Sequence, residues 1–208
     1  MSEQHRRIAV ISLASAPDEG SWLTDFVDDA SPFGVTIDEH ALESQLDASV
    51  TGRVTAAWIA IDHVLMGYLC RRIAEALHGR GVTVISLVHP RANVSKHAVL
   101  GDGVLVGAGT VIEAAVEVGA HARVNHGAIV GRGARIGAFS AIDPGCIIGE
   151  RARIGAHCWI RRGVSIESRT EIGDHCEFHI PGVWGGTFPE GYVHLAGFDG
   201  PIRIHRFG

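Results

Sequence analysis

Residues 118–148, VGAHARVNHGAIVGRGARIGAFSAIDPGCII, repeat one pattern every six positions. The aliphatic position of this pattern recurs without a break from Val94 to Ile172, and Phe178 takes the next place. A short side chain lies two residues before each of these positions, and glycine follows more than half of them. This period fits neither a 3.6-residue helix nor the alternation of an ordinary strand, but it is typical of a parallel β-helix built from short segments.

The repeat also predicts the size of the β-helix. Three hexads close one triangular coil, so residues eighteen apart stack at the strand spacing of roughly 4.8 Å. The hexads from Val94 to Phe178 therefore predict about five coils around a continuous core that no single repeat could bury.

The composition is that of an ordinary globular protein. The chain has 208 residues, of which 46% are hydrophobic and 20% charged, enough for one domain or two small ones. Its net charge of −5 argues against nucleic acid as a partner. No apolar run approaches the roughly 18 residues needed to cross a membrane, and residues 1–7 are too polar for a signal peptide, so we expect no membrane partner and a cytoplasmic location.

The four cysteines agree with a reducing compartment. Their spacing does not match a metal site, and three of them, Cys146, Cys158 and Cys176, occupy the short inward position of the hexad. We therefore expect reduced thiols within the core of the β-helix.

The residues ahead of the repeat predict alternating strands and helices. The expected strands are Arg7–Leu13, Thr55–Ile61 and Val82–Val88. The expected helices are Ser21–Val27 and His63–His78, the second of which stops at Gly79 and Gly81. Segment 35–52 fits neither pattern clearly. This alternation predicts a small parallel α/β domain, of a kind that binds ligands at the C-terminal ends of its strands.

Three parts of the chain follow from these patterns: an α/β domain at 1–86, the β-helix at 87–180, and a C-terminal cap or tail at 181–208. The last part has four aromatic residues, Trp184, Phe188, Tyr192 and Phe198. They can cover the open end of the solenoid or line a substrate pocket, and we favour the cap because an open solenoid end must be covered.

The order of three motifs resembles a known family. AAWIAI at 56–61, RRIAEAL at 71–77 and VISLVHP at 84–90 precede the first hexad. In this order they resemble the sugar acyltransferases of the sialic-acid O-acetyltransferase type, which include bacterial nucleotide-sugar N-acetyltransferases. The resemblance covers about residues 55–175.

The resemblance implies a fold, a reaction and an assembly. It implies a Rossmann-like N-terminal domain that holds the acceptor, a left-handed β-helix that binds acetyl-CoA, and a homotrimer with active sites between subunits. The reaction would be acetyl transfer to nitrogen or oxygen of a sugar or nucleotide-linked amino sugar.

Two stretches depart from the family pattern. The first strand leads into SLASAPDEG at 12–20, where the family has a glycine-rich turn able to bring backbone N–H groups to a phosphate. IDHV at 61–64 replaces the family's Gly-Asp-Asn. Whether the acceptor carries a nucleotide is therefore left open by the sequence. The missing glycines argue against the binding of a dinucleotide by this domain.

Acyl transfer needs a base for the acceptor proton and a donor for the oxyanion. The resemblance places a catalytic His two residues after one inward aliphatic and four before the next, which is the position of His126. Asn125 and, one coil later, Asp143 are candidates to orient the ring. Counting instead from His89 places the catalytic position at Arg132, and a plain surface role for His126 is the other alternative.

The resemblance also implies a path for acetyl-CoA along the later coils. Arg135 follows His126 by nine residues, at a position that approaches the cofactor in the family. Ala156 and Asp174 match the family's CoA contacts. Arg162 is the candidate for pairing with the CoA phosphates. Arg151, Arg161 and Arg169 are further candidates for this role.

Two alternatives to this enzyme come from other classes. His121, His157 and His175 share one hexad position, which superficially resembles a β-helix carbonic anhydrase. Zinc there needs three converging imidazoles, and the second His expected within six residues of the first is missing, so we expect no metal. The other alternative is a non-catalytic trimeric scaffold or sensor.

Overall fold

The computed structural model of this protein describes residues 7–13, 31–37, 41–60, 66–195, 200 and 202–203. The chain divides into two compact units, Met1–Leu87 and Val88–Gly208. The helix expected at Ser21–Val27, the stretch 14–20 and Phe198 lie outside the described residues.

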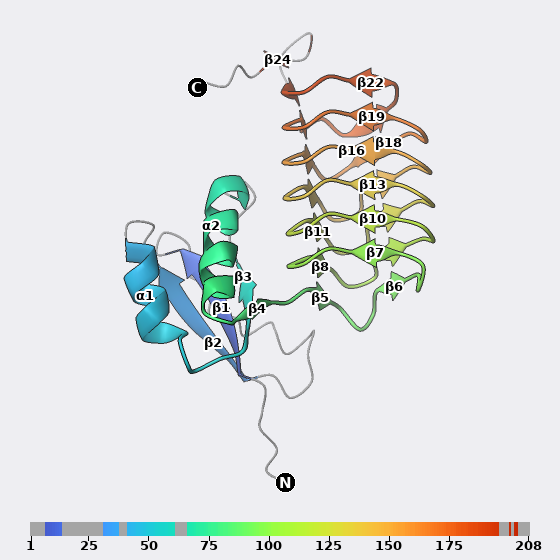
Figure 1. The fold of residues 1–208 in the computed structure, drawn as a ribbon. Helices are drawn as coiled ribbons and strands as arrows, with labels where there is room; N and C mark the ends of the chain where they lie inside the picture. The colour runs from blue at the N-terminus through green and yellow to red at the C-terminus, as the bar shows by residue number, and fades with distance from the viewer. Residues whose placement is uncertain are drawn as a thin grey trace. The chain divides into compact units, whose positions relative to one another are not determined.

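A four-stranded parallel sheet forms the centre of the first unit, in the order β2-β1-β3-β4 (Figure 1). Its strands are β1 Arg7–Leu13, β2 Ser31–Ile37, β3 Ala56–Ile59 and β4 Thr83–Val84. The run from Ile8 to Ile11 on β1 is buried without alternation, as parallel sheets with two covered faces require. The expected small parallel α/β unit is confirmed at this level.

Two helices accompany this sheet, α1 Leu42–Ser49 and α2 Met66–Gly79. On α2, Leu69, Ile73 and Leu77 are spaced four apart and are buried, so one face of the helix packs inward as its pattern predicts. Gly81 has a φ of +71°, the left-handed backbone that ends the helix. Neither described helix is long and apolar enough to cross a membrane.

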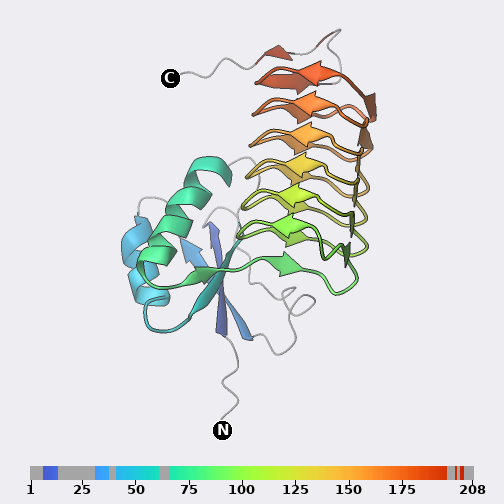
Figure 2. The same ribbon diagram turned by 45° about the vertical axis from the view of Figure 1, so that its right-hand side comes forward.

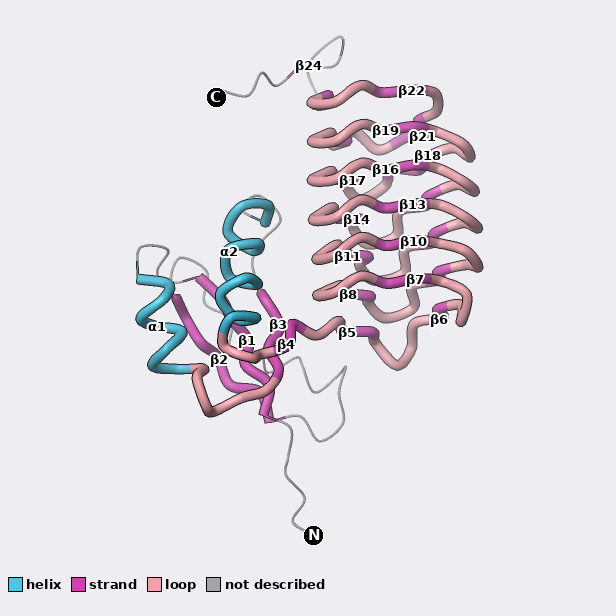
Figure 3. Tube along the Cα trace, viewed as in Figure 1, coloured by secondary structure: helices cyan, strands magenta, loops and turns pink. Residues whose placement is uncertain are grey.

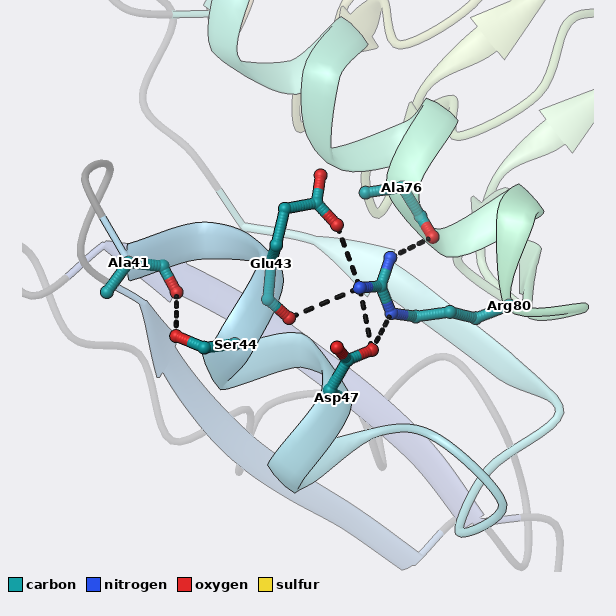
Figure 4. A network of polar contacts seen from close by, with 6 residues as sticks. All are labelled: Ala41, Glu43, Ser44, Asp47, Ala76 and Arg80. Atoms are coloured by element: carbon teal, nitrogen blue, oxygen red, sulfur yellow. Dashed lines mark hydrogen bonds and ion pairs between the residues drawn. The ribbon is translucent and has the colours of Figure 1, made fainter.

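Arg80 ties the end of α2 to α1 (Figure 4). Its guanidinium donates to Asp47 Oδ1 and to Glu43 Oε2, each at 2.8 Å, and to the Ala76 carbonyl at 2.8 Å. The same group therefore pairs with two α1 carboxylates and satisfies a carbonyl in the last turn of α2, where helices leave acceptors unpaired.

The second unit is a left-handed parallel β-solenoid of about six turns, with three faces of stacked short strands (Figures 2 and 3). Face I contains β5 Leu87–Val88, β8 Leu105–Val106, β11 Arg123–Val124, β14 Ala141–Ile142, β17 Trp159–Ile160, β20 Glu177–Phe178, β23 Tyr192–His194 and the antiparallel β24 Ile202–Arg203. Face II contains β6 Asn93–Val94, β9 Val111–Ile112, β12 Ile129–Val130, β15 Ile147–Ile148, β18 Val164–Ile166 and β21 Gly182–Trp184. Face III contains β7 Val99–Leu100, β10 Glu117–Val118, β13 Arg135–Ile136, β16 Arg153–Ile154, β19 Glu171–Ile172 and β22 Thr187–Phe188.

The solenoid core is the aliphatic column that the hexads predict. Val124 pairs in register with Ile142, eighteen residues later, and both side chains are fully buried. The inward cysteines Cys146, Cys158 and Cys176 are buried free thiols, as expected.

The count of about five coils is too low. A further coil follows Phe178, in which Trp184, Phe188 and His194 pair with Ile166, Ile172 and Phe178 and so take the inward positions. These residues are aromatic, and Phe188 and His194 pair with residues sixteen positions earlier and not eighteen, so the hexad pattern is lost while the strand pairing continues. Trp184, Phe188 and Tyr192 pack against the core, which supports the expected cap.

The single strand expected at Val82–Val88 is also wrong. Thr83–Val84 pairs with β3 in the first sheet, whereas Leu87–Val88 begins face I of the solenoid. One apolar run therefore serves two sheets, and periodicity does not show the break between them. The ambiguous segment 35–52 contains the end of β2 and all of α1.

Candidate functional site

His126 lies on the corner between faces I and II, after β11 and before β12. Val124 and Val130, the flanking inward residues, are fully buried, as the spacing of the hexads predicts. The side chain of His126 is exposed, and Gly127 turns the chain with a φ of +66°. The histidine is thus held by rigid strands on both sides.

Asn125 and Asp143 lie on the same corner, in adjacent coils, as predicted. The Asp143 carboxylate, however, is engaged with the following coil: it accepts a hydrogen bond from Trp159 Nε1 at 3.1 Å and pairs with Arg161 Nε at 3.3 Å. Arg161 also stacks over the Trp159 ring, 3.9 Å from its centroid. Trp159, which the spacing of the sequence did not single out, therefore organises this part of the corner.

The four predicted cofactor residues are divided among three places. Arg162 is exposed on the same corner as His126, two coils later. Arg135 is on face III, where it pairs with Glu117 at 2.9 Å. Ala156 and Asp174 are on the corner between faces III and I, and the Ala156 N–H donates to Asp174 Oδ1 at 2.7 Å. Within one subunit, face I separates this pair from the His126 corner.

Arg132, the alternative catalytic position, occupies a different corner. It follows β12, between faces II and III, and its backbone N–H donates to Glu113 Oε2 at 2.8 Å. His126 and Arg132 therefore flank the same strand at its two ends, and the two possible registers correspond to two distinct surfaces.

Three further solenoid histidines, His121, His157 and His175, form an aromatic column with Phe139 on the corner between faces III and I. The rings of His121, Phe139, His157 and His175 are stacked in this order with centroids 5.1, 5.1 and 4.6 Å apart, and their planes are within 7° of parallel. Stacked imidazoles do not direct their nitrogens toward one point. In the described part of the chain, no group of three or more His, Cys, Asp or Glu side chains is arranged to hold a metal.

The outward side chains of faces II and III differ in chemical character. On face II, Ile129, Ile147 and Val183 point outward and are 40, 45 and 71% exposed. On face III, the outward column contains Glu117, Arg135, Arg153 and Glu171 in adjacent strands, an ion-pair stripe suited to water. Exposed apolar side chains, interrupted by Ser165 between Ile147 and Val183, thus line face II beside the His126 corner.

Two of the buried cysteines, Cys146 and Cys158, do not provide a nucleophile, whereas a hydrogen bond with Cys158 lowers the pKa of the buried Cys176 to about 7. Burial raises the pKa of Cys146 to about 11, and a hydrogen bond with Cys176, together with burial, raises the pKa of Cys158. Both thiols are therefore protonated at neutral pH, which removes the reactive thiolate form.

The repeat and the fold both match known proteins. Residues 127–162 match the family model described as bacterial transferase hexapeptide (six repeats). No curated protein matches the sequence. The fold defines the class of the second unit as a hexapeptide-repeat β-helix, and several solved structures match most of the chain, two of them with TM-scores above 0.5 as follows.

One solved structure is PerB from Caulobacter crescentus in complex with CoA and GDP-perosamine. It is 24% identical, the match covers 89% of this chain and 92% of that chain, and the TM-score is 0.56. The other is the acetyltransferase domain of PglB from Neisseria gonorrhoeae, 22% identical, with 90% and 95% covered and a TM-score of 0.57. This chain shares their fold, and the expected resemblance to hexapeptide-repeat sugar acyltransferases is confirmed at that level.

Proposed function

We propose that this protein is an acyltransferase that moves the acetyl group of acetyl-CoA to an amine or hydroxyl of a sugar or a nucleotide-linked amino sugar. The observation that carries the proposal is the transferase hexapeptide match over 127–162, which begins at the residue after His126. The fold shared with PerB, solved in complex with CoA and GDP-perosamine, gives the candidate substrates.

His126 is the proposed general base. Its exposed imidazole takes the proton from the acceptor as the acceptor nitrogen or oxygen attacks the thioester carbonyl. The tetrahedral intermediate then collapses, the C–S bond breaks, and CoA leaves as the thiol after receiving a proton. Asn125 is the neighbour proposed to orient the ring, while Asp143 supports Trp159 and Arg161 on the next coil.

The cofactor would lie along the coils that follow His126. Arg162 is the proposed phosphate partner, because its exposed guanidinium is on the same corner and Arg can bind phosphate in a bidentate manner. Ala156, Asp174 and Arg135 are the further proposed contacts. Since they are distributed over another corner and face III, they and His126 would meet around one cofactor only if two subunits contribute.

A homotrimer provides this arrangement. The exposed Ile129, Ile147 and Val183 make face II the surface proposed to bind a second copy, since burial of apolar surface drives association. Cyclic symmetry closes such contacts, and the His126 corner then lies at a subunit boundary. We propose that the α/β part at residues 1–86, expected from the resemblance to be Rossmann-like, binds the acceptor.

Acetyl-CoA turnover tests the proposal directly. The intact protein is mixed with acetyl-CoA and a panel of nucleotide-linked amino sugars beginning with GDP-perosamine, and released CoA thiol is followed with a thiol reagent. The protein's own thiols are buried and react slowly with the reagent, so the background signal of the assay is low. Turnover with one acceptor supports the enzyme, whereas no turnover and no calorimetric binding of acetyl-CoA would leave the scaffold alternative in its place.

A further inference from the structure

The imidazole of His126 lies against Gly107, the corner residue of the preceding coil. If Gly107 had a Cβ, that atom would overlap His126 Nδ1 and would lie 2.6 Å from the His126 backbone nitrogen. Gly107 itself is buried. The ring therefore occupies space that any side chain at Gly107 would fill.

The backbone angles of the turn do not require a glycine at this position, although a Cβ there would also meet the backbone of the next coil at Asn125 and His126. The four following coils have Asn125, Asp143, Arg161 and His179 at the equivalent place, eighteen residues apart. The φ of Gly107 also lies outside the left-handed region that favours glycine. Among these equivalent positions from 107 to 179, glycine occurs only at 107, in the coil that precedes the coil of His126.

We propose that Gly107 is a positioning residue for His126, which rests on the proposed function of His126 as the base. The missing side chain lets the imidazole settle against the coil, which limits the rotation of a ring whose χ2 is otherwise broad. A base must be held within about 0.5 Å of its productive position, because small displacements reduce the rate strongly.

A double-mutant cycle separates this role from a purely structural one. G107A is expected to lower kcat for acetyl transfer by roughly 10- to 100-fold, with KM for acetyl-CoA within about twofold. In the H126A background, G107A should cause no further loss, since no ring remains to displace. Equal losses in both backgrounds would mean that Gly107 acts on the backbone alone and would overturn the proposal.

Gly119 provides a matched control. It occupies the same hexad position, and a Cβ there would approach only backbone atoms, Ala138 N at 2.5 Å being the nearest. G119A should therefore cost stability as G107A does while leaving kcat close to that of the parent protein. A loss of kcat in G119A as large as in G107A would contradict the proposal.

An imidazole NMR spectrum gives a readout that needs no acceptor. With histidine labelled by nitrogen-15, G107A should shift the ring signals of His126, identified by their absence in H126A, and G119A should not. If G107A unfolds too early to assay, the spectra of all variants are recorded at a lower temperature in sucrose, which favours the folded state. Unshifted signals in a folded variant overturn the proposal. Full activity of H126A, with shifted signals in G107A, would instead overturn the proposed base and leave the packing of the ring intact.

Discussion

Two corners of one solenoid hold histidines in opposite surroundings. Between faces III and I, His121, His157 and His175 stack with Phe139 in a continuous column. Between faces I and II, His126 is exposed and has a glycine beneath it. The residues eighteen positions away therefore decide whether the ring of a histidine at these two corners is stacked in a column or exposed to solvent.

Removal of the imidazole from each corner should produce the largest contrast. H126A is expected to lower acetyl transfer by roughly 10²–10⁴-fold, the range for loss of a positioned base. Its fold should be retained, because the side chain is exposed. H121A, at the other corner, should keep the rate within about threefold. Steady-state rates with the acceptor found by screening measure both, and an active H126A with an inactive R132A would assign the reaction to the corner between faces II and III.

Breaking the aromatic column should cost stability instead of activity. Phe139 stacks with a ring on each side, and aromatic pairs contribute about 0.5–1.5 kcal/mol each. F139A is therefore expected to lower the free energy of unfolding by roughly 1–3 kcal/mol. Because Phe139 has a φ of 58°, F139G should lose less, since glycine accepts this backbone. Denaturant unfolding measures the series, and equal stability of F139A and the parent protein would show that the stack contributes nothing.

The last coil provides a smaller, pH-dependent contrast with the regular coils. His194 occupies an inward position among Phe178, Trp184 and Phe188, and its Nε2 is buried without a hydrogen-bond partner. Burial lowers the pKa of His194 below the usual value of 6.5. Above that value the ring is neutral in both states, and the full contribution to stability is present. As the pH falls below about 6.5, the unfolded chain takes up the proton first and stability declines until the folded pKa is reached.

H194F tests this assignment because it keeps a ring in the cap and removes the titrating nitrogen. The difference in melting temperature between H194F and the parent protein should widen as the pH falls from 7 to 5. A difference that is constant with pH would contradict the assignment of this titration to His194.

The regular coils were predictable from the sequence because each inward position repeats one chemical type. The last coil was not, since Trp184, Phe188 and His194 keep the strand pairing while breaking the aliphatic pattern. The helix α1 and the end of strand β2 were likewise hidden within one ambiguous segment.

The site was predictable in part. The spacing of Val124 and Val130 placed His126 on a corner, and the structure agrees. The spacing could not show that the Asp143 side chain contacts Trp159 and Arg161. The hexad pattern predicts the coil in which a residue lies, but it does not predict the direction of its side chain. Gly107 has a visible signal, the one glycine in a column of polar residues, but its meaning depends on the ring above it.

A structure of this protein with acetyl-CoA bound would distinguish the His126 corner from the Arg132 corner. We expect a homotrimer in which the thioester lies beside His126, within the roughly 3 Å reach of a base or one water away, with the phosphates near Arg162. Acetyl-CoA bound beside Arg132, with its thioester distant from His126, would contradict the assignment of His126 as the base.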